Sequence, residues 1–71
     1  MNISDAVEQI SSLIETVDDW GYEALREAAS NPDDVARVKR AKQFGSAKRS
    51  LEKAREQLRR ADEYQPANDE N

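Results

Sequence analysis

The residues Ser30-Asn31-Pro32-Asp33-Asp34 divide the chain into two parts. A proline pushes the residue before it out of the helical region, so a helix that reaches Ser30 has to end here. The same residues suit the start of a second helix, with Asn31 as its N-cap, Pro32 in the first helical position and two aspartates in the first turn. The stretch therefore predicts two helices, over about residues 4–29 and 32–63, joined by a tight turn.

Apolar or small residues before the turn recur in alternating steps of four and three, the heptad pattern of one long helix that packs along a single seam. They are Ile3, Val7, Ile10, Ile14, Val17, Gly21, Ala24 and Ala28. Asn2 or Ser4 can cap the start of this helix, and Asp5 places a negative charge near the positive end of its dipole. We therefore expect one uninterrupted helix up to the turn.

Apolar residues after the turn form a less regular series, namely Val35, Val38, Ala41, Phe44, Ala47, Leu51, Ala54, Leu58 and Ala61. Gly45 lies where the spacing changes, so a break there, with Ser46 capping a third helix, is the alternative to a single second helix. We favour the single helix, because Lys48 and Arg49 would fall in the first turn of a third helix, where the dipole disfavours positive charge. The expected fold is an all-α antiparallel two-helix hairpin over residues 1–64, and its rival is a three-helix bundle with a break at Gly45.

Two helices joined by a tight turn run antiparallel, and facing residues are expected to have numbers that add up to about 62. This register pairs Ile10 with Leu51, Ile14 with Ala47, Val17 with Phe44 and Gly21 with Ala41. It also predicts ion pairs at the edges: Glu8 with Arg55 or Lys53, Glu15 with Lys48 or Arg49, and Asp18 or Asp19 with Lys42. Exposed pairs are worth only about 0.2–1 kcal/mol each, so we expect them mainly to fix the register.

The charges are divided between the two parts of the chain. Residues 1–34 hold nine acidic residues against Arg26 alone, a net charge of −8, whereas residues 35–60 hold ten basic residues against Glu52 and Glu56, a net charge of +8. The four acidic residues that follow bring the whole chain to −4. The hairpin is thus internally complementary. Residues 65–71 have no apolar period and contain Pro66, so we expect a disordered acidic tail there.

A single hydrophobic core in a chain of 71 residues rarely stabilises a fold without a cross-link or a partner. This chain has no Cys, so it cannot form a disulfide. A second stripe on the first helix would stay exposed in a lone hairpin. It consists of Ala6, Leu13 and Trp20 at seven-residue spacing, with Tyr22 and Leu25 near the turn. We expect this stripe to be the interface with a partner, and two copies to form a homodimer, an antiparallel four-helix bundle.

Enzyme activity is not expected. Without Cys and His the chain lacks thiol and imidazole chemistry and the usual zinc ligands. Glu15, Asp18 and Asp19 are spaced like the carboxylates that hold magnesium in nucleotide-hydrolysing helical bundles, but the facing acids that would complete such a site are missing. We therefore predict no catalytic residue, no metal and no cofactor.

Neither a signal peptide nor a membrane-spanning segment is visible in the sequence. The first residues lack a basic segment followed by an apolar one, and no apolar run reaches the roughly 20 residues that cross a bilayer. We expect a cytoplasmic protein that does not contact membranes.

Two functions fit these features. The first is a non-enzymatic protein–protein interaction module that acts as a regulator, inhibitor or adapter, because aromatic residues such as Trp20 dominate binding hot spots. The alternative is an RNA- or DNA-binding bundle whose second helix contacts phosphates through Arg37, Arg40, Lys48, Arg49 and Arg55. The net acidic charge favours the first, and so does the acidic helix predicted to lie against the basic one.

Overall fold

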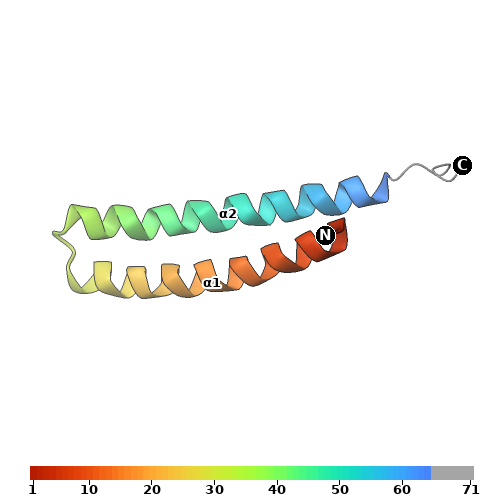
Figure 1. Cartoon of the computed structure of the whole chain (residues 1–71). Coiled ribbons are helices and arrows are strands. Elements are labelled where there is room, and N and C mark those ends of the chain that lie inside the picture. The colour runs from red at the N-terminus through yellow and green to blue at the C-terminus, as the bar shows by residue number, and fades with distance from the viewer. Residues whose placement is uncertain (65–71) are drawn as a thin grey trace, which may run out of the picture.

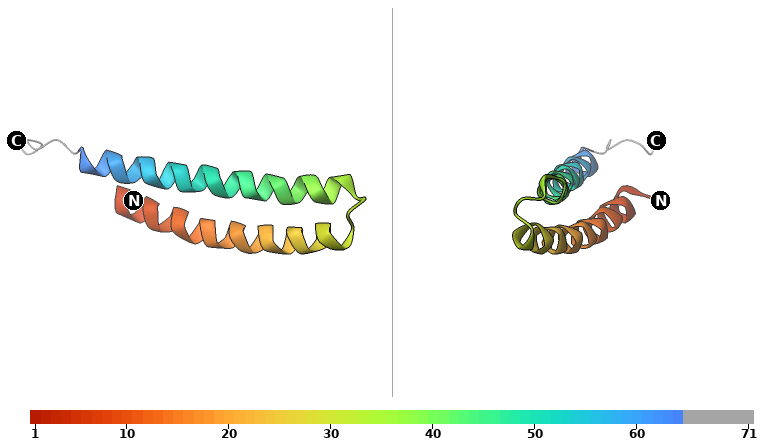
Figure 2. Two further views of the ribbon diagram at one scale, coloured as in Figure 1. Left: turned by 180° about the vertical axis from the view of Figure 1, so that it is seen from behind. Right: turned by 90° about the vertical axis from the view of Figure 1, so that its left-hand side faces the viewer.

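The protein is an antiparallel pair of long helices in a computed structural model, which describes residues 1–64 (Figure 1). Helix α1 spans Ile3–Ser30 and helix α2 spans Val35–Glu63, and no strand occurs in this part of the chain. The helices lie side by side along their length, with the N-terminus near the end of α2 (Figure 2). The predicted all-α two-helix hairpin is confirmed. The predicted tail, residues 65–71, lies outside the described residues.

The N-terminus of α1 is closed by a capping box. The backbone N–H of Asp5 donates to the side chain of Asn2 at 2.8 Å, and the backbone N–H of Asn2 donates to the Asp5 carboxylate at 3.3 Å. Two of the backbone donors that a helix start leaves without partners are satisfied in this way. Asn2, one of the two predicted caps, is therefore the cap.

The start of α2 differs from the prediction, because Asp34 and not Asn31 is its N-cap. Asn31 instead ends α1, where its Nδ2 donates to the carbonyl oxygen of Glu27 at 2.9 Å. Asp34 accepts from the backbone N–H of Arg37 and forms an ion pair with the Arg37 guanidinium at 2.9 Å. Pro32 consequently lies in the turn, and α2 begins three residues later than expected.

Helix α2 runs through Gly45 without a break, so the three-helix alternative is wrong. Gly45 has no positive φ, and a Cβ at this position would meet only the far end of the Arg49 side chain, at 3.6 Å. Good helix formers such as Ala41, Lys42 and Lys48 surround it. One glycine costs about 1 kcal/mol in a helix, which is too little to interrupt this segment.

The later start of α2 shifts the register by about one helical turn from the prediction. The described contacts join Asp18 to Lys48, Ser11 to Arg55 and Trp20 to Phe44, pairs whose numbers add up to 64 or 66 and not to 62. Gly21 faces Phe44, whose Cβ lies 3.4 Å from the position of a Cβ built on the glycine, and not Ala41 as predicted. The predicted ion-pair partners of Lys48 and Arg55 are wrong for the same reason.

The core between the helices is thin. Only Ile14, Val17, Ala24 and Ala41 are buried within residues 1–64. The predicted seam of α1 is confirmed, since all of its members are buried or half-buried. Three members of the α2 series, Val35, Ala47 and Ala61, are exposed instead. Two cationic residues, Lys48 and Arg55, are half-buried between the helices, and this explains why the apolar series of α2 did not reveal the contact line.

Replacing Gly45 by alanine is expected to stabilise the hairpin by about 1 kcal/mol, because alanine restricts the unfolded chain and the site has room for a methyl group. For a domain of this size, such a gain raises the melting temperature by roughly 4–8 °C. Gly21→Ala is the matched comparison and should gain less, because its methyl group would press against Phe44. Thermal unfolding followed by circular dichroism measures both changes, and an equal gain would contradict the close approach at Gly21.

Candidate functional site

One side of the hairpin carries apolar side chains from both helices. The rings of Trp20 and Phe44 are in contact there, with centroids 6.1 Å apart and planes tilted by 54°. Steps of seven residues from this pair place Leu13 level with Leu51 and Ala6 level with Leu58, because each pair of numbers adds up to 64. We call the six residues of these three layers the uncharged flank. Leu13 and Trp20 remain 50% and 55% exposed, so the hairpin alone does not cover the flank.

A row of small residues continues the uncharged flank on the outer edge of α2. Ala47, Ala54 and Ala61 follow one another at seven-residue spacing, and Ala47 and Ala61 are exposed. The next positions around the helix are Gln43, Ser50 and Gln57, and the corresponding edge of α1 carries Gln9 and Thr16. In a chain with 37% charged residues, the positions on this side of the hairpin from Ala6 to Trp20 and from Gln43 to Leu58 hold no charged residue, and the nearest charge is the Arg40 guanidinium over the Phe44 ring.

The opposite side of the hairpin holds the polar contacts between the helices. The ammonium group of Lys48 donates to the Asp18 carboxylate at 2.8 Å, and the Arg55 guanidinium donates to the Ser11 hydroxyl at 3.1 Å. The numbers of both pairs add up to 66, and the pairs lie seven residues apart. The Nε of Arg55 is buried without a hydrogen-bond partner. We call this side the polar flank, and its contacts hold the register of the two helices.

The predicted interface residues divide between the two sides. Ala6, Leu13 and Trp20 belong to the uncharged flank, whereas Tyr22 and Leu25 line an open groove on the polar flank together with Asp18 and Lys48. Tyr22 lies two residues after Trp20, which is about 200° around the helix. The stripe predicted from the sequence is therefore not one continuous surface.

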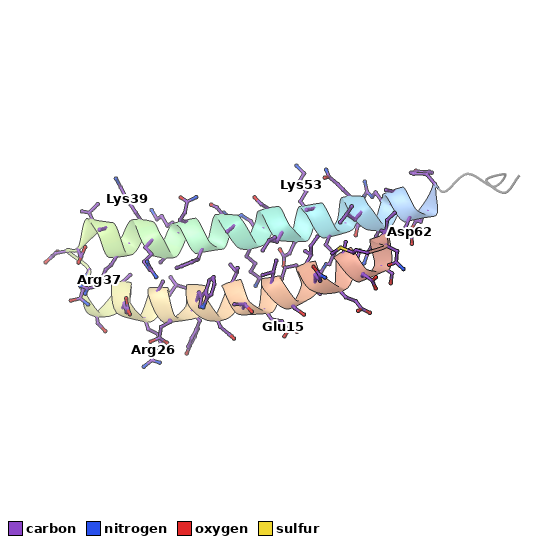
Figure 3. The ribbon with its side chains drawn as sticks, viewed as in Figure 1. Glu15, Arg26, Arg37, Lys39, Lys53 and Asp62 are labelled. Atoms are coloured by element: carbon purple, nitrogen blue, oxygen red, sulfur yellow. The ribbon has the colours of Figure 1, made fainter. Side chains whose placement is uncertain are left out.

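The five basic residues predicted for nucleic-acid contact all lie on α2. Each already has a partner within the hairpin: Arg37 binds Asp34, Arg49 binds Ser46, Lys48 binds Asp18, Arg55 binds Ser11, and the Arg40 guanidinium lies 5.1 Å from the centre of the Phe44 ring. Other charges point away from the contact between the helices, as Lys39 and Lys53 on α2 and Glu15 and Arg26 on α1 show (Figure 3).

The acidic run Glu15, Asp18 and Asp19 does not form a metal site in the structure. Asp18 is bound to Lys48, and Glu15 points away from α2 (Figure 3). Within residues 1–64, no three acidic side chains come together in a way that could hold a metal ion. In the same part of the chain, no helix is long and apolar enough to cross a bilayer.

The ion pair between Lys48 and Asp18 raises the pKa of Lys48 above its ordinary value of 10.5, first through the hydrogen bond to Asp18 and then through the charge of that carboxylate. A raised pKa means that the folded state holds this proton more tightly than the unfolded state. The stabilisation is therefore present at neutral pH and is lost as the pH rises through the pKa of folded Lys48.

Replacing Asp18 by asparagine is expected to lower the pKa of Lys48 toward 10.5, because both main causes of the shift are removed. The titration of the Lys48 side chain, followed by NMR, measures the change. Asp19→Asn removes a neighbouring acid that does not contact Lys48, and it should leave the raised pKa in place. The same decrease in both variants would show that the general acidity of α1 causes the shift.

Sequence reasoning assigned Phe44, Leu51 and Leu58 to the contact between the helices, together with the alanines of α2. Their second role, as half of the uncharged flank, was missed. The signal is present in the seven-residue spacing of the two rows and in the absence of charge between them, but it is visible only once the register of the helices is known.

The chain has no match among the models of known protein families, among curated proteins or among solved structures. Its function is therefore inferred from its own residues.

Proposed function

We propose that the chain is a non-enzymatic protein–protein interaction module, a small regulator, inhibitor or adapter, and that the uncharged flank is its binding surface. One observation carries the proposal. A continuous strip without charge runs along both helices of a highly charged chain and exposes Trp20 and Leu13 to water. Exposed apolar strips with polar surroundings mark interaction sites, and tryptophan is among the residues most enriched in binding hot spots.

The thin core of the hairpin supports the same proposal. Four small or medium-sized buried side chains stabilise a fold of this length only weakly, and no side chain within residues 1–64 is fully buried. A partner that covers the flank would add the missing apolar burial. In this proposal the chain covers its flank first by self-association into a homodimer, an antiparallel four-helix bundle in the cytoplasm.

The size of the hairpin face fits a stable interface. At 1.5 Å per residue, the flank from Ala6 to Trp20 is about 22 Å long, and the 28 residues of α1 are about 42 Å long. Two helices side by side are about 20 Å wide, so the flank alone offers roughly 440 Å² and the whole face of the hairpin roughly 800 Å². Each partner buries about 800 Å² in an interface of standard size, so the interface has to extend beyond the flank toward both ends of the helices.

The oligomeric state in solution tests the proposal. Light scattering on the purified chain at micromolar concentration is expected to give twice the monomer mass, and the dimer should persist in high salt, because salt does not screen the apolar contacts of the flank. A nucleic-acid complex would instead weaken steeply with added salt. A monomer at every concentration that binds no protein would contradict the proposal, and so would salt-sensitive binding of RNA or DNA by the basic residues of α2.

A further inference from the structure

Two rows of residues that run along the uncharged flank and on toward the turn match each other position by position. The row on α1 is Ala6, Leu13, Trp20 and Glu27, and the row on the outer edge of α2 is Ala61, Ala54, Ala47 and Arg40. Both rows repeat every seven residues, and the numbers of each corresponding pair add up to 67. Since contacts within the hairpin join numbers that add up to 64–66, the members of each pair lie at nearly the same height along the helices.

The matched pairs are complementary in size and charge. Trp20 lies at the height of Ala47, and Leu13 at that of Ala54, so each large side chain corresponds to a small one. Glu27 corresponds to Arg40, an acid to a base. In the row on α2, Ala47 and Ala61 are exposed and Ala54 is half-buried. The α1 helix of another chain can contact this row.

We infer that the occupant of the uncharged flank is a second copy of this chain, related by a two-fold axis parallel to the helices. The inference rests on the proposed function and specifies how the two copies are arranged. Such an axis keeps every residue at its own height, so the row on α1 of each copy packs on the row on α2 of the other, and each matched pair occurs twice. Both turns lie at the same end of the four-helix bundle.

The charges of the two helices favour this arrangement over the inverted one. With the axis parallel to the helices, acidic α1 lies beside basic α2 of the other copy. A two-fold axis perpendicular to the helices would instead place α1 against α1 and α2 against α2. That arrangement brings helices of like net charge together and separates Glu27 from Arg40.

The rim of this interface gives a direct test. Thr16 on α1 and Ser50 on α2 are exposed polar residues beside the two rows, and their numbers add up to 66, so they meet across the dimer in the inferred arrangement. The chain has no Cys, which means that a single introduced cysteine has no intramolecular partner. Thr16→Cys and Ser50→Cys are made as separate full-length chains, mixed in equal amounts and oxidised, and the masses of the covalent products are measured.

The mixed disulfide between Cys at 16 and Cys at 50 is expected to dominate, because only this pair approaches within disulfide distance. A product that joins two Ser50→Cys chains would show the inverted arrangement and overturn the inference while leaving self-association intact. A dimer by light scattering without any specific disulfide would overturn the inference as well. A monomer by light scattering would contradict both the inference and the self-association on which it rests.

Ser46→Cys is the matched control for the second chain of the mixture. Ser46 is an exposed serine one turn before Ser50, and it lies beside the charged residues of α2, where its hydroxyl accepts a hydrogen bond from Arg49. Ser46 differs from Ser50 both in its position along the helix axis and in the direction in which it leaves the helix. A mixture of Thr16→Cys with Ser46→Cys should therefore give only the slow, random cross-linking of exposed thiols. Equal yields from Ser46→Cys and Ser50→Cys would overturn the inference.

Discussion

Replacing Trp20 by alanine is expected to abolish self-association at micromolar concentration. Truncation of a hot-spot tryptophan costs about 2 kcal/mol or more, and the residue occurs twice in a symmetric dimer. A total of about 4 kcal/mol raises the dissociation constant roughly a thousandfold. Sedimentation velocity over a range of concentrations measures the change. The hairpin should also become slightly less stable, because the ring contact with Phe44 is lost with the indole.

Tyr22→Ala is the matched control for this experiment. Tyr22 lies two residues after Trp20 and is exposed to a similar degree, 66% against 55%, but it lines the groove on the polar flank. Loss of its ring should leave the dimer unchanged. If Tyr22→Ala dissociated the dimer as strongly as Trp20→Ala, the interface would extend over both flanks, and the division between them would not describe the binding surface.

The sequence predicted α1 better than α2, and the reason lies in the residue types. Isoleucine and valine occupy most seam positions of α1 and no other position of that helix, so its buried face was identified correctly. Alanine fits both buried and exposed helix positions, so the series Ala41, Ala47, Ala54 and Ala61 did not define one face of α2. Lys48 and Arg55, which no apolar pattern would include, lie between the helices.

The register was the second point that the sequence left open. Asn31 and Asp34 are equally suitable N-caps, and the choice between them moves α2 by three residues, almost one turn. In the structure Asn31 binds the end of α1 and Asp34 binds Arg37, and the residue types alone predict neither contact. The three-residue error was enough to hide the pairing of Trp20 with Phe44, and with it the α2 half of the candidate site. By contrast, the seven-residue spacing of Ala6, Leu13 and Trp20 was enough to place these three residues on one side of α1.

Ala47→Glu is expected to keep the chain monomeric while leaving the hairpin folded. Ala47 is exposed in the hairpin, and glutamate is nearly as good a helix former as alanine, so the helix content measured by circular dichroism should stay the same. In the dimer, the new carboxylate would lie against Trp20 of the other copy, without a cation to pair with it. Burial of an unpaired charge costs several kcal/mol, and symmetry doubles the cost.

Ser46→Glu is the control for this substitution, because it adds the same side chain to α2 one residue earlier but outside the uncharged flank. Sedimentation velocity should show a monomer for Ala47→Glu and a dimer for Ser46→Glu at the same concentration. Comparing the two variants separates the effect of the position of the new glutamate from the effect of its charge, because both variants add one acid to a chain of net charge −4. If the dimer survived Ala47→Glu, the row of alanines would lie outside the interface. A glutamate that stays exposed to water on a basic helix is not expected to weaken the dimer. A monomer in both variants would instead mean that the added negative charge, wherever it lies, drives the copies apart.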